Sequence, residues 1–158
     1  MAPFENLGFV WASVLCFSLA VGSAILPWVN AEMLVLSLPA VARSHAHLLG
    51  LVLVATAGHM IGKCVVYWTG RHGGTLMSKR VAHVLDAWRD RFTRQPSSPV
   101  VLVFLSSAVG IPPFYLMSVV AGALKLGFSQ YLAAGTLGRL IRFAALAFIP
   151  EAAYQAFH

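Results

Sequence analysis

The chain has 158 residues, of which 59% are hydrophobic and only 10% are charged, and its mean hydropathy is +0.78. An ordinary soluble domain carries about 25% charged residues, so this composition excludes that class and predicts an integral membrane protein. The net charge of +6 would suit a nucleic-acid partner, but six of the eleven Lys and Arg residues fall within residues 71–98. The positive-inside rule places that segment in the cytoplasm, and we expect no nucleic-acid partner.

The first predicted element is the uncharged segment Gly8–Val29, which is long enough to cross about 30 Å of hydrocarbon. It is too long for the apolar core of a signal peptide and has no Lys or Arg before it, so we expect it to be retained. A break containing Pro27 and Asn30 follows, because proline ends helices. Residues 33–42 are too few to cross the membrane as a helix, which predicts a re-entrant arm.

A second long apolar segment, about 46–70, comes next. It begins at the sequence His45-Ala46-His47, where the two imidazoles point in different directions and suit an interface better than a metal site. Within residues 75–92, apolar side chains recur at helical spacing between basic ones. This pattern predicts an amphipathic helix in the cytoplasmic headgroup region, or alternatively a soluble connector.

The second half begins with the apolar segment Pro99–Leu124, which is interrupted at Gly110, Pro112 and Pro113. A re-entrant hairpin here would keep Lys125 on the cytoplasmic side, and a single kinked span is the alternative. A fourth apolar segment, about 127–150, completes the chain.

The two halves resemble each other weakly when Gly58-His59 is laid over Gly138-Arg139, because both then contain a break, a short apolar arm and a long helix with polar residues. Matching breaks in two halves are typical of inverted-repeat transporters. We therefore predict one all-α polytopic domain over residues 1–158. It would consist of an inverted repeat (halves about 8–70 and 99–157) of a re-entrant hairpin plus a transmembrane helix, joined by the amphipathic linker 71–98.

Ionisable residues inside the membrane are costly and mark a substrate or ion path by default. Those predicted here are Glu32, His59, Lys63, Arg139 and Arg142. Arg139 is roughly 18 Å from either end of its segment, so it needs a partner or a water-filled cavity. The alternative roles are structural: a buried ion pair of Arg139, with Glu32 as one partner, and a snorkelling anchor for Lys63. Glycines beside these residues would allow close packing: Gly58, Gly62, Gly135 and Gly138.

If both half-helices start near the membrane midplane, their free N–H groups would face an anion. Arg139 and Arg142, assisted by Lys63 and His59, would make that site cationic, and phosphate accepts bidentate Arg contacts. Glu32 is either a carboxylate at a favourable helix N-terminus or a proton-coupling and gating group. The aromatic residues Phe114, Tyr115, Phe128 and Tyr131 could line a path for lipid tails, although most such residues serve packing.

The sequence resembles the DedA family, also called the VTT or SNARE-associated domain, and in particular its small YqaA-like members. The resemblance runs from about Phe9 to Tyr154. In the first half it depends on the stretch from Pro27 to Glu32, on Gly58-x-x-x-Gly62 and on Tyr67-Trp68-Thr69-Gly70-Arg71. In the second it depends on Gly110-Ile111-Pro112-Pro113-Phe114-Tyr115, Ala121-Gly122, Phe128 and Gly138-Arg139-x-x-Arg142-Phe143.

The resemblance implies two opposed re-entrant hairpins and translocation of lipids, including undecaprenyl phosphate recycling, with the family's acidic residue at Glu32. Two features depart from the family. Residues 106–110 contain no arginine beside the second break, and Lys63 stands near the position of a second membrane acid.

Taken together, the sequence predicts a lipid flippase or scramblase in the bacterial inner membrane. We expect no enzymatic activity, cofactor or metal, and the partners would be anionic lipids, with homo-oligomers allowed. The alternatives are a transporter of a small soluble solute, a membrane scaffold or assembly factor and, more distantly, an intramembrane phosphatase or transferase.

Overall fold

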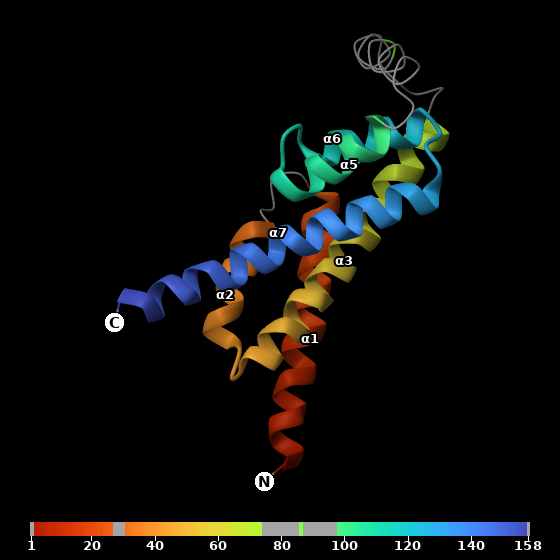
Figure 1. Cartoon of the computed structure of the whole chain (residues 1–158). Coiled ribbons are helices and arrows are strands. Elements are labelled where there is room, and N and C mark those ends of the chain that lie inside the picture. Colours follow the sequence, from red (N-terminus) through yellow and green to blue (C-terminus); the bar gives the residue numbers. More distant parts are fainter. Residues whose placement is uncertain (1, 27–30, 74–85, 87–97, 158) are drawn as a thin grey trace. The chain divides into compact units, whose positions relative to one another are not determined.

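The computed structural model describes residues 2–26, 31–73, 86 and 98–157, with the side chains of 2–7, 98 and 150–157 left out. All regular structure in this part of the chain is helical, which confirms the predicted all-α class. The helices are α1 (Ala2–Ile25), α2 (Ala31–Val41), α3 (His45–His72), α5 (Ser98–Val109), α6 (Phe114–Ala123) and α7 (Phe128–Phe157) (Figure 1). The break residues Pro27 and Asn30, and the predicted amphipathic helix within 75–92, lie outside the described residues apart from Asp86.

Three of these helices are long and apolar enough to cross a membrane. The crossing segments are Gly8–Ile25 of α1, His45–His72 of α3 and Phe128–Ile149 of α7, whereas α2, α5 and α6 are shorter apolar helices. The predicted fourth apolar segment, about 127–150, agrees with the crossing segment Phe128–Ile149, and helix α7 itself continues beyond it to Phe157.

The break in the second half is a helical hairpin. Helix α5 ends at Val109 and is followed by Gly110, whose φ of 90° favours glycine because a side chain there would be strained. Pro113 precedes the first residue of α6. The two short helices pack against each other (Figure 1). Ser106 Oγ donates a hydrogen bond to the Pro112 carbonyl across the break. A single kinked span would not fold back in this way.

Helix α6 ends in a Schellman motif at Lys125, which has a φ of 56°. The Lys125 N–H donates to the Gly122 carbonyl, and the Leu126 N–H donates to the Ala121 carbonyl, both at 2.9 Å. These bonds satisfy carbonyl groups that the end of the helix leaves unpaired. The motif sets the sharp turn from α6 into α7.

The chain divides into two compact units. Unit 1 contains residues 1–62 and 140–158, and unit 2 contains residues 63–139. Helices α3 and α7 therefore each contribute one part to each unit.

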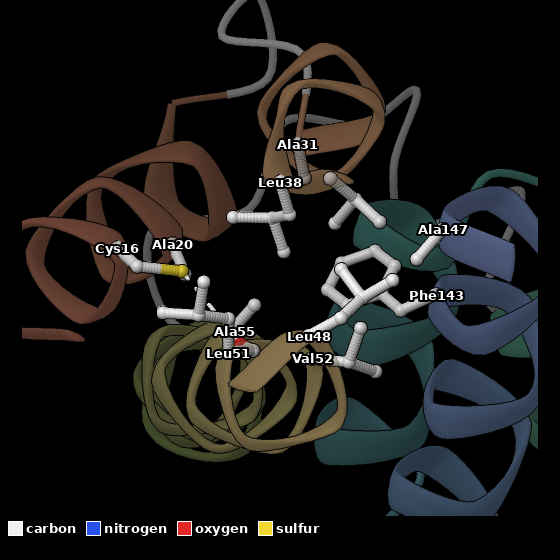
Figure 2. Close-up of a cluster of buried hydrophobic side chains, with 11 residues drawn as sticks. Cys16, Ala20, Ala31, Leu38, Leu48, Leu51, Val52, Ala55, Phe143 and Ala147 are labelled. Atoms are coloured by element: carbon white, nitrogen blue, oxygen red, sulfur yellow. Dashed lines mark hydrogen bonds between the residues drawn. The ribbon is translucent and has the colours of Figure 1, made fainter. Parts of the chain in front are cut away.

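Unit 1 has a core built from four helices. Figure 2 shows Cys16 and Ala20 of α1, Ala31 and Leu38 of α2, and Leu48 and Val52 of α3 converging with Phe143 and Ala147 of α7. Every one of these side chains is 7% exposed or less. This core fixes the start of α2, which carries Glu32, beside the part of α7 that carries Arg142.

Glycines let the helices approach closely, and they do so at corresponding places in the two halves. A Cβ at Gly58 of α3 would lie 2.7 Å from the Phe17 carbonyl oxygen of α1. A Cβ at Gly138 of α7 would lie 2.6 Å from the Phe104 carbonyl oxygen of α5. In each half, the backbone of the helix that precedes the break packs directly against the glycine of the long helix. This correspondence fits the predicted repeat, while its inverted orientation stays a prediction.

Candidate functional site

In unit 1, the carboxylate of Glu32 is paired with Arg142. Glu32 lies in the first turn of α2, where an acidic side chain is favourable to the helix dipole. Arg142 donates from Nε to Glu32 Oε1 at 3.0 Å and also from Nη2 to the same oxygen. The Arg142 side chain is 21% exposed and that of Glu32 is 37% exposed. The ion pair is therefore partly buried and partly in contact with solvent. It connects α2 with α7.

His59 lies in the same unit and is almost fully buried, at 3% exposed. Its ring contacts the Phe143 ring edge to face, with centroids 5.6 Å apart. Because Phe143 follows Arg142 directly in α7, this contact places the imidazole beside the segment that carries the ion pair. Unit 1 thus brings together three of the five ionisable residues predicted to lie within the membrane.

Unit 2 contains the other two, Lys63 of α3 and Arg139 of α7, and both are buried, at 4% and 6% exposed. Lys63 Nζ lies 4.9 Å from the centroid of the Tyr115 ring, and Arg139 Cζ lies 4.9 Å from the centroid of the Phe114 ring. Both distances are within the range of cation–π attraction. Since Phe114 and Tyr115 are the first two residues of α6, both cations are held at the start of this helix.

The start of α6 supplies a second source of positive potential. Pro113 at the N-cap position makes no side-chain capping hydrogen bond, and its carbonyl accepts from the Met117 N–H at 3.1 Å. A helix N-terminus carries about half a positive charge and attracts anions. The arrangement can therefore bind a negatively charged group of a ligand between the helix start and two cations.

A hydrogen-bond chain holds α6 in place behind this site. Tyr131 of α7 is completely buried, and its hydroxyl lies 2.8 Å from Ser118 Oγ and 3.2 Å from the Lys63 carbonyl. Ser118 in turn donates to the Phe114 carbonyl at 2.7 Å. Hydroxyls buried among helices are stabilising when they are satisfied in this way. The network links the three helices that carry Lys63, Phe114 and Arg139.

The C-terminal end of α3 is joined to α6 by an unusually close contact. A Cβ at Gly122 would overlap the Tyr67 carbonyl oxygen, and a Cβ at Gly70 would overlap the Val119 carbonyl oxygen. The Tyr67 hydroxyl donates to the Leu126 carbonyl and accepts from Arg71 Nη1 at 2.7 Å. Its ring also stacks on Tyr131, with centroids 4.7 Å apart.

The sequence located the five ionisable residues but missed the neighbours that position them. Side chains of Phe114 and Tyr115 were expected to line a tail path, whereas here they contact the cations. Tyr67, Ser118, Gly70 and Gly122 were not predicted as positioning residues. Tyr67, Gly70 and Gly122 occur in the motifs of the family resemblance, and Ser118 does not. Arg142 was expected to hold phosphate, and its guanidinium lies on Glu32.

No group of three or more His, Cys, Asp or Glu residues among the described residues could hold a metal ion. Cys16 and Cys64 are free thiols, and Cys16 contacts the Leu51 carbonyl at 3.8 Å within the core of unit 1.

Long apolar helices, a helical hairpin between two of them and cations buried at its turn define a helical membrane protein of the transporter-like kind. A family model described as the VTT domain matches residues 17–151. The chain belongs to the VTT (DedA) family of membrane proteins, which confirms the resemblance seen in its sequence. No curated protein and no solved structure matches it significantly.

Proposed function

We propose that this protein moves a phosphate-bearing lipid, such as undecaprenyl phosphate or a phospholipid, between the leaflets of the bacterial cytoplasmic membrane. The function is binding and translocation without covalent chemistry, so it needs no cofactor and no metal. The protein would be multi-pass, with residues 71–98 in the cytoplasm, and its partners are anionic lipids and, in a homo-oligomer, further copies of the chain.

The observation that carries this proposal is the pair of buried cations in unit 2. Lys63 and Arg139 are buried against adjacent rings at an uncapped helix start, within helices that are mostly apolar. Two cations gathered at one helix start inside an apolar segment attract an anion. A lipid phosphate offers the required charge, and its tails can remain in the hydrocarbon while the headgroup crosses.

In unit 1, the Glu32–Arg142 pair supports a gating role. A phosphate that approached Arg142 would compete with the carboxylate for the same guanidinium. His59 would assist, because its ring contacts Phe143, the residue after Arg142. Displacement of the carboxylate by the headgroup would release α2 from α7, and we include in the proposal that Glu32 couples this step to protons.

The test is leaflet exchange in liposomes that contain the purified protein and a fluorescent lipid, followed by accessibility to an external quencher. Lipids with a phosphate monoester headgroup are compared with a lipid lacking phosphate. The variants are Arg139→Gln, which removes the charge, and Arg139→Lys, which keeps the charge but loses the bidentate geometry. Lys125→Gln is the matched control, because Lys125 is an exposed cation outside the transmembrane helices.

We expect phosphate-dependent exchange by the wild type and by Lys125→Gln, at least a tenfold loss in Arg139→Gln and an intermediate rate in Arg139→Lys. One hydrogen-bonded charge contributes about 1.5–3 kcal/mol, which corresponds to roughly 10–150-fold. Exchange equal to that of empty liposomes with every lipid would refute the proposal. Uptake of a soluble anion by the same liposomes would then indicate a solute transporter, and no transport of either kind would indicate a scaffold.

A further inference from the structure

A cavity opens at the end of unit 1 where α2 ends and α3 begins. It has a volume of about 100 Å³, well above the roughly 10–15 Å³ that holds one water molecule. Its lining includes two polar side chains, Arg43 and His47, which we call the polar wall. The apolar lining residues include Phe9 and Ala12 of α1, Val41 of α2 and Leu51 of α3. The cavity lies outside the group of residues assigned above to headgroup translocation.

The polar wall is held in place by its neighbours. The His47 ring stacks on the Phe9 ring, with centroids 4.8 Å apart. The backbone N–H of His47 donates to Ser44 Oγ at 3.2 Å, and this bond caps the start of α3. The Arg43 guanidinium passes over Gly8, where a Cβ would lie 3.8 Å from Nη2. Phe9 is itself fixed against Gly50, since a Cβ there would lie 3.2 Å from the ring. His47 is thus oriented before any ligand arrives.

The ionisable side chains that line the recesses at this end of unit 1 are all basic ones, Arg43, His45 and His47. A second recess of about 200 Å³ shares Arg43 with the cavity and is lined by His45 and Ser44 as well. Glu32, the acidic residue of unit 1 whose side chain is described, lies at the opposite end of α2, roughly 15 Å away along the helix. Guanidinium and imidazole N–H groups are donors, so the polar wall favours an anion.

The position of the cavity at the start of the membrane-crossing segments indicates that the anion is a lipid headgroup. The membrane-crossing segments of α1 and α3 begin at Gly8 and His45, so the polar wall lies where the apolar stretches start. A membrane places lipid headgroups at that level, with their tails alongside the apolar residues. The cavity lining contains both kinds of group, the donors of Arg43 and His47 and the apolar side chains of Phe9, Val41 and Leu51.

We propose that this cavity binds the phosphate headgroup of an anionic membrane lipid, with Arg43 and His47 contacting the phosphate and Phe9 and Leu51 contacting the first carbons of the tail. Helix α3, with 28 residues, is long enough to cross the membrane. The site therefore lies at the leaflet opposite to the cytoplasmic residues 71–98. The proposal does not depend on leaflet exchange, because a lipid can be bound here whether or not the protein translocates it.

The experiment uses the full chain in a neutral detergent, with histidine side chains labelled for NMR and the His47 signal assigned by comparison with His47→Gln. Three probes are titrated separately: a short-chain phosphatidylglycerol, the matching phosphatidylcholine and inorganic phosphate. The variants are Arg43→Gln, which removes the charge, and Gly8→Leu, which fills the cavity while leaving its donors in place. Lys125→Gln is again the control for loss of one exposed cation.

We expect phosphatidylglycerol to shift the His47 signal, with a midpoint at least tenfold higher in Arg43→Gln, no saturable shift in Gly8→Leu and an unchanged midpoint in Lys125→Gln. Two results would overturn the proposal outright: no shift of His47 with any probe, or equal midpoints for wild type and Arg43→Gln. An equal response to phosphatidylcholine would exclude selection of anionic headgroups. An equal response to inorganic phosphate would assign the cavity to soluble anions and exclude the lipid.

Discussion

The contact between Gly122 of α6 and the Tyr67–Arg71 turn of α3 makes a quantitative prediction about the hairpin. A Cβ at position 122 would overlap the Tyr67 carbonyl oxygen and lie 2.9 Å from the Arg71 nitrogen. Carbon atoms in contact normally lie about 3.5–4.0 Å apart, and backbone atoms cannot rotate away as a side chain can. Gly122→Ala therefore forces α6 away from α3.

Gly22→Ala is the matched control. Gly22 is also inside a helix, α1, but nothing lies within 4 Å of the position that its Cβ would occupy. Both substitutions gain the same intrinsic helix propensity, about 0.8–1 kcal/mol, so this contribution cancels in the comparison. What remains is the cost of overpacking at Gly122, about 1–3 kcal/mol.

We expect Gly22→Ala to be as stable as wild type or more stable, and Gly122→Ala to be less stable than Gly22→Ala by about 1–3 kcal/mol. The free energy of unfolding is measured by SDS titration in mixed micelles, followed by far-ultraviolet circular dichroism. Leaflet exchange should also fall in Gly122→Ala, because α6 carries the rings that contact Lys63 and Arg139. If the two variants differ by less than about 0.5 kcal/mol, a typical error for such comparisons, the close contact does not exist in solution.

Three further predictions concern single interactions, and each is measured by the same SDS titration. A double-mutant cycle of Glu32→Gln and Arg142→Gln should give a coupling of about 1–2 kcal/mol, since the pair is partly buried, and a value near zero would show that it does not form. Lys125→Gly should stabilise the protein by about 1 kcal/mol, because glycine adopts a φ of 56° without strain; destabilisation would argue against the Schellman motif. Tyr131→Phe should cost about 1 kcal/mol through the lost hydrogen bond to Ser118, and an unchanged stability would contradict that bond.

The helix boundaries show which features of the fold could be predicted from the sequence. Glycine and proline at 110, 112 and 113 predicted a break that the structure confirms, because these residues act locally on the backbone. The sequence could not separate a hairpin from a kinked span, since that depends on whether α5 and α6 contact each other. The fourth apolar segment, about 127–150, was located by hydropathy, whereas α7 extends beyond it to Phe157, because a helix need not end where its apolar stretch ends.

The candidate site likewise has features that the sequence predicted and features that it did not. Charged residues in apolar segments are visible in any membrane sequence, and Glu32, His59, Lys63, Arg139 and Arg142 were all found by that criterion. Their partners were not, because a buried cation can be stabilised by a carboxylate, by a carbonyl or by an aromatic ring, and the choice depends on distances between helices.

The sequence by itself determined that this protein is a membrane-embedded helical member of the VTT family, because hydropathy, breaks and isolated charges are local properties of the chain. Only the tertiary structure decided which arginine contacts Glu32, that Lys63 and Arg139 lie on the rings of Phe114 and Tyr115, and that Arg43 and His47 line a cavity with Phe9. These depend on the approach of helices far apart in the sequence. That approach is set by where small residues such as Gly58, Gly122 and Gly138 allow backbones to touch.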